Sequence, residues 1–215
     1  MARTAVEAGN DDEAIAYFNR VLEADPTVSE AWLGKGRAVA RLSSLKHVRI
    51  RETATAFGHA IGSTPEADRA SVREIALVEL VAFATRLYQM SRSHWAKYQQ
   101  IDGTAEQGAA TALAIADALE VGLRWAPHHR PALDIAITVC ANALTHDVDG
   151  GQAVLLRQKL EGSSRPSERS ILNLRLPKTR QMHGTSPGRR SGRLRPPPRR
   201  RRIAMRCSWD SRLQR

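Results

Sequence analysis

A short pattern that occurs twice, 39 residues apart, constrains this chain more than any other feature. Ala14-x-x-x-Phe18 and Thr53-x-x-x-Phe57 are each followed by a proline eight residues after the phenylalanine. A small residue four positions before an aromatic ring lies on the same face of a helix. A proline at that distance ends one helix or begins the next. The pattern therefore predicts successive pairs of helices with a proline at each boundary between pairs.

The rest of residues 1–162 also has a helical character. Ala, Leu, Glu and Arg dominate, and the alternation typical of strands is missing. We therefore predict an all-α fold, in which Thr64 and Thr104 cap the helices that follow them. The expected helices span residues 11–25, 29–43, 50–63, 66–101, 105–126, 129–146 and 149–162.

The segment between the two patterns reads Trp32-x-x-Lys35-Gly36-x-x-Val39. With it, the chain resembles the tetratricopeptide repeat family, of bacterial type, most closely over residues 8–65. The matching residues are Ala14, Phe18, Pro26, Trp32, Gly36, Phe57 and Pro65. Lys35, Val39 and Thr53 depart from the family's Leu, Tyr and Ala, and the 39-residue interval exceeds the usual repeat of about 34.

The resemblance implies an α-solenoid of antiparallel helix pairs whose concave face, built from the first helix of each pair, binds a peptide or protein. On helix 29–43 the face away from Trp32 and Gly36 would supply that site. Its candidate partner-binding residues are Glu30, Leu33, Arg37 and Arg41. Arg37 and Arg41 lie one turn apart and could together hold a carboxylate. A solvated charged face without a partner is the alternative interpretation.

No group of residues indicates an active site, so we expect no enzyme, no cofactor and no metal centre. His128, His129 and His146 lack metal-binding spacing. Cys140 lies in an apolar run and is expected in the core. The aromatic residues of the long helix, Trp95 among them, are interpreted as a core stripe, with a ligand surface as the alternative.

The charge is divided between two parts of the chain. Residues 163–215 contain 15 Arg and one Lys but only two acidic residues, a net charge of +14, whereas residues 1–162 carry −3. Six of the ten prolines also lie in residues 163–215. We expect residues 1–162 to form the helical domain and residues 163–215 a disordered tail. Two explanations of the tail compete. It could be an arm that binds nucleic acid or an acidic partner. It could instead be a frameshift product, because GC-rich codons that are read out of frame yield Arg, Pro, Gly and Ser.

The leading hypothesis is a non-enzymatic scaffold that binds a peptide or protein segment. The alternatives are a nucleic-acid-associated protein acting through its tail, or a non-functional gene remnant. No stretch has the apolar length of a signal peptide or membrane span, which favours a cytoplasmic location without membrane contact. Only residues 1–8 remain for the first helix of the first pair, so we expect a truncated family member with a tendency to self-associate.

Overall fold

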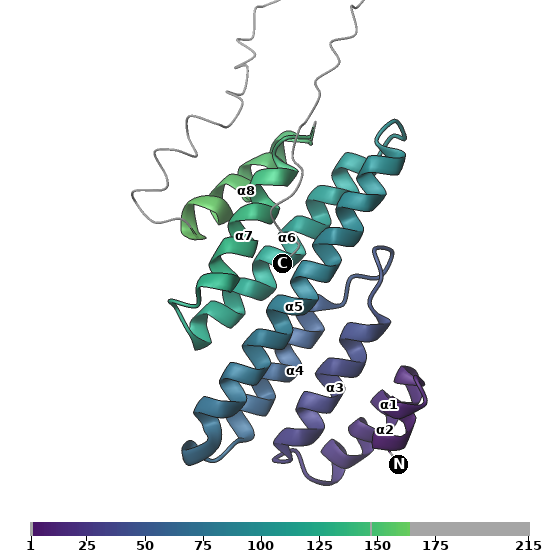
Figure 1. Cartoon of the computed structure of the whole chain (residues 1–215), viewed down its shortest axis with the longest axis vertical. Helices are drawn as coiled ribbons and strands as arrows, with labels where there is room; N and C mark the ends of the chain where they lie inside the picture. The colour runs from purple at the N-terminus through teal and green to yellow at the C-terminus, as the bar shows by residue number, and fades with distance from the viewer. Residues whose placement is uncertain (1, 147, 164–215) are drawn as a thin grey trace, which may run out of the picture. The chain divides into compact units, whose positions relative to one another are not determined.

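The computed structural model describes residues 2–146 and 148–163, and in these ranges it contains helices and no strand. The helices are α1 (Ala2–Glu7), α2 (Asp11–Ala24), α3 (Ser29–Leu42), α4 (Ile50–Ser63), α5 (Glu66–Tyr98), α6 (Thr104–Trp125), α7 (Arg130–Ala143) and α8 (Gly150–Ser163) (Figure 1). The predicted all-α fold is confirmed, with α1 as an additional short helix. The predicted tail lies outside the described residues, except for Ser163, which ends α8.

The helices pack as a stack of pairs. Each helix contacts the next one along the chain, and contacts also join α3 to α5, α5 to α7, α4 to α6 and α6 to α8. The first helices of successive pairs, α3, α5 and α7, therefore form one layer, and the second helices, α4, α6 and α8, form another (Figure 1). This alternation confirms the predicted tetratricopeptide-like solenoid.

Two glycines of α3 let phenylalanines of its neighbours approach the helix backbone. A Cβ atom at Gly36 would lie 2.5 Å from Cε1 of Phe57, which comes from α4 and is 1% exposed. A Cβ atom at Gly34 would collide with the ring of Phe18, which comes from α2. Both repeated phenylalanines therefore pack against the same helix, one from each side. This packing explains why the pattern needs glycine between its aromatic residues.

The helix ends differ from the predicted caps at two threonines. Thr64 ends α4 instead of starting α5: its hydroxyl donates a 2.7 Å hydrogen bond to the carbonyl of Ala60. Thr104 is the first residue of α6, and its hydroxyl bonds the carbonyl of Tyr98 at 3.1 Å. Both predictions of side-chain N-caps were wrong, because these hydroxyls donate to carbonyls of the preceding helix. The helix that follows therefore begins without a hydrogen bond from a capping side chain.

Candidate partner-binding site

The structure separates the four predicted partner-binding residues of α3 into two groups. Glu30, Arg37 and Arg41 lie on the exposed side of the helix. Leu33 is only 8% exposed and belongs to the hydrophobic core. The prediction that Leu33 faces a partner is therefore wrong, because this side of α3 packs against the rest of the stack. The two arginines remain together on the exposed side.

Arg37 bridges two neighbouring first helices. Its guanidinium binds both carboxylate oxygens of Glu79 on α5, with Nε–Oε2 and Nη2–Oε1 distances of 2.8 and 2.6 Å. This hydrogen bonding to Glu79 raises the pKa of Arg37. Planar two-point contacts of this kind fix the orientation of both side chains. The pair therefore holds the arginine in a defined position in the layer of first helices.

Arg41 also has a carboxylate partner within the chain. Its Nε lies 2.7 Å from Oδ1 of Asp11, whose side chain is 11% exposed at the start of α2. The sequence showed the two arginines as a pair able to bind an external carboxylate. In the structure each arginine already binds a carboxylate of the chain itself, so an acidic partner would have to share these two ion pairs or replace them.

A cleft lies between α3 and α5, with α4 beneath it. It is lined by Arg37, Ala40, Arg41, Phe57, Glu79, Ala82, Phe83 and Arg86. The third arginine, Arg86, did not emerge from the sequence. Its guanidinium lies 5.1 Å from the centre of the Phe83 ring and donates to the carbonyl of Ala40. Within the described part of the chain Arg86 pairs with no carboxylate, so it is the arginine of the cleft most available to an acidic group.

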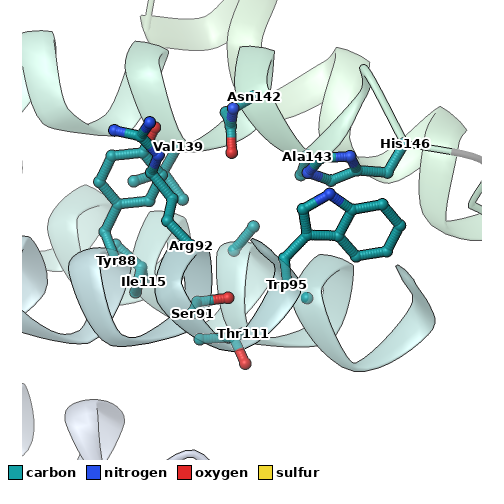
Figure 2. A pocket seen from close by; sticks show the side chains of 12 residues that line it. Tyr88, Ser91, Arg92, Trp95, Thr111, Ile115, Val139, Asn142, Ala143 and His146 are labelled. Carbon is teal, nitrogen blue, oxygen red and sulfur yellow. The ribbon is translucent and has the colours of Figure 1, made fainter. Parts of the chain in front are cut away.

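A second hollow lies between α5 and α7, with α6 beneath it (Figure 2). It is lined by Tyr88, Ser91, Arg92, Trp95, Gly108, Thr111, Ala112, Ile115, Val139, Asn142, Ala143 and His146. Trp95 and His146 stack at one end, with ring centres 3.9 Å apart. Trp95 is half-buried at this hollow, so the interpretation of this aromatic as a core residue was wrong. Burial lowers the pKa of His146.

The remaining residues considered for chemistry have structural roles. Cys140 is 1% exposed, as predicted, and burial raises the pKa of its thiol to about 12. His129 caps α7, because its Nδ1 accepts a hydrogen bond from the backbone N–H of Ala132. No group of three or more His, Cys, Asp or Glu residues suited to a metal ion occurs in residues 2–146 and 148–163. None of the helices in these ranges is both long and apolar enough to cross a membrane.

A family model described as a tetratricopeptide repeat matches residues 1–38. This segment comprises α1, α2 and most of α3. It therefore includes Phe18 and the two glycines, Gly34 and Gly36, against which the phenylalanines pack. The match confirms the resemblance to the tetratricopeptide repeat family. No curated protein and no solved structure matched the chain in the corresponding comparisons.

Proposed function

We propose that the chain is a non-enzymatic scaffold that binds an acidic protein segment on the exposed face of its first helices, at the cleft between α3 and α5. The observation that carries the proposal is the convergence of three arginines, Arg37, Arg41 and Arg86, from two helices on one cleft. The tetratricopeptide match supports a role in protein binding.

The charge of the cleft contrasts with that of its surroundings. Residues 1–162 carry a net charge of −3, yet the three arginines of the cleft meet only two carboxylates, those of Glu79 and of Asp11, so one positive charge, that of Arg86, is left over. An acidic side chain is therefore attracted to the cleft more than to the surface around it. Arg86 offers donors that are not engaged with a carboxylate, and Ala40, Ala82 and Phe83 offer apolar area beside them. The cleft can therefore bind the carboxylate of an acidic side chain at Arg86 and the aliphatic stem of the same side chain against the apolar residues.

Selection from a phage-displayed library of random linear peptides on the full chain tests this proposal. The basic C-terminal segment also attracts peptides with Asp or Glu, so their enrichment alone does not test the cleft, and the comparison of variants does. We expect about tenfold weaker binding of a selected peptide to Arg86→Glu, because that variant reverses the charge without breaking an ion pair. Arg124→Glu, an exposed position on the second-helix layer, is the matched control and should bind normally. Equal binding by wild type and Arg86→Glu would refute the proposed cleft.

The basic C-terminal segment supports a second candidate function, in nucleic-acid binding. Arg199–Arg202 are four consecutive arginines in a segment with a net charge of +14. Such runs bind phosphates without sequence preference and lose affinity steeply with salt. Replacing these four arginines with serine in the full chain should weaken binding of a single-stranded oligonucleotide and make that binding less dependent on salt, whereas Arg86→Glu should leave both unchanged. Unchanged affinity and unchanged salt dependence after the serine replacement would exclude a role of these four arginines.

A further inference from the structure

The cleft between α3 and α5 and the hollow between α5 and α7 are equivalent sites in successive pairs. Each has two first helices as walls and the second helix between them as its floor: α4 contributes Phe57 to one, and α6 contributes Ile115 to the other. Both therefore open on the layer of first helices, on opposite sides of the exposed stripe of α5 that contains Gln89. A single bound peptide segment that crosses α5 would therefore contact both the cleft and the hollow.

The two sites differ in size and polarity. The hollow between α5 and α7 has a cavity volume of about 20 Å³, against about 310 Å³ for the open cleft between α3 and α5. A volume of this size accommodates one or two methyl-sized groups but no ring. Ala112, Ile115, Val139 and Ala143 give it an apolar interior. The narrower site is therefore suited to the branched end of an aliphatic side chain.

Two polar groups at the hollow lack partners within the described residues. Figure 2 shows the Asn142 amide and the Ser91 hydroxyl on opposite sides of the space. Neither side chain forms a hydrogen bond with another described residue, and both are partly buried. An amide both donates and accepts, which matches the N–H and C=O of an extended peptide backbone. These groups favour a peptide over a free hydrocarbon as the occupant.

We propose that the hollow between α5 and α7 binds an aliphatic side chain of the same segment whose acidic residue occupies the cleft between α3 and α5. This inference rests on the proposed function. Arg92 stands at the rim of the hollow, so an acidic segment is favoured along the whole path. On α5 the residues that line the two sites are centred about nine positions apart, which is about 13.5 Å along the helix, and with about 10 Å across the helix the sites are about 17 Å apart. An extended peptide covers that distance in about five residues.

Synthetic peptides with one Glu and one Leu test the proposal on the full chain. We expect a peptide with Leu about five residues from Glu, in one of the two sequence orders, to bind about tenfold more tightly than its Leu→Ala counterpart. Moving Leu to about two residues from Glu should remove the gain, because both sites can then no longer be occupied together. The basic C-terminal segment attracts all these peptides equally, so the differences between them report on the two sites.

Gly108→Leu places a side chain in the hollow and should remove the advantage of the Leu peptide. A Cβ atom at Gly108 would meet only the Ser91 hydroxyl, at 4.0 Å, so the helix can accept it. Gly108→Ala is the milder variant in case leucine disturbs the fold. An advantage of Leu that persists in both variants would overturn the assignment of the hollow.

The outcomes separate this inference from the proposed function. Equal binding of the Leu and Ala peptides, with both weakened by Arg86→Glu, would overturn the aliphatic site and leave the acidic cleft standing. A Leu advantage that Gly108→Leu removes, with no effect of Arg86→Glu, would support the hollow and refute the acidic cleft. Binding that is insensitive to Leu, to Gly108→Leu and to Arg86→Glu would overturn both.

Discussion

At the scale of single residues, close contact between helices depends on two glycines and two phenylalanines. Gly36 and Phe57 were recognised in the sequence as parts of the family pattern, and the structure shows their contact: Cε1 of Phe57 lies 2.5 Å from the position of a Cβ at Gly36. The contact between Gly34 and Phe18 could not be predicted, because it joins two different repeats. The side-chain caps failed for a related reason: a threonine at a helix boundary can bond either helix, and sequence alone does not decide between them.

Gly36→Ala should destabilise the fold by about 1–3 kcal/mol, because the added methyl group forces the buried ring of Phe57 to move. Gly62→Ala is the matched control, since nothing lies within 4 Å of a Cβ at this position of α4. It should be neutral or stabilise the fold by up to about 1 kcal/mol through helix propensity. Urea unfolding of the three proteins measures both effects. Equal stability of Gly36→Ala and wild type would show that the packing between α3 and α4 can accommodate the added methyl group.

His146 should make stability depend on pH. Burial lowers the pKa of His146 in the folded state below the value of about 6.5 that histidine has in an unfolded chain. At a pH near or below 6.5 the unfolded chain therefore binds a proton at His146 more readily than the folded chain does. Its contribution to stability is therefore complete above about pH 6.5 and is lost as the pH falls through the lowered value. Urea midpoints at about pH 7.5 and about pH 5.5 should differ less in His146→Gln than in wild type. An identical difference in both proteins would contradict this role.

At the scale of helices, much of the architecture could be predicted from local sequence. The predicted helix bounds lie within about three residues of those observed, because proline, glycine and Asn-Asp turns mark the ends locally. The contacts between helices could not be predicted in the same way. Glu79 and Arg86 lie seven residues apart on a predicted helix, but nothing in the sequence shows that this side of α5 faces Arg37. Half of the candidate cleft was therefore missed.

A chain of ion pairs also joins the second helices. Asp117 of α6 pairs with Arg51 of α4 and lies 2.9 Å from Nζ of Lys159 on α8, which binds Glu120 at 2.5 Å. Hydrogen bonds to Glu120 and Asp117 raise the pKa of Lys159. Because one aspartate holds two cations from different helices, its removal affects two interfaces at once.

Asp117→Asn should therefore lower the free energy of unfolding by up to about 1 kcal/mol, and the loss should shrink in about 1 M salt, which screens exposed charges. Asp134→Asn is the control: its pair with Arg130 lies within α7 at 3.7 Å and is well exposed. That variant should change stability little. A loss for Asp117→Asn that is unaffected by salt would point to packing as the cause.

At the scale of the whole molecule, the division of charge determines how binding must be tested. Residues 163–215 carry +14 and attract any acidic ligand, whereas the cleft belongs to a helical part with a net charge of −3. Bulk affinity for an acidic partner therefore cannot identify the site. Variants within the cleft can, because they leave the basic segment unchanged.

Site-specific photo-crosslinking would show whether a partner segment lies across α5 on the layer of first helices. A photoreactive residue would replace Gln89, on the exposed side of α5, Leu155, on the exposed side of α8, or Gln181, in the basic segment. We predict that a selected acidic peptide crosslinks strongly to position 89 and only weakly to position 155, and that Arg86→Glu reduces crosslinking at position 89 but not at position 181, where the basic segment attracts the peptide independently. Crosslinking confined to position 181 or to position 155 would contradict binding across α5.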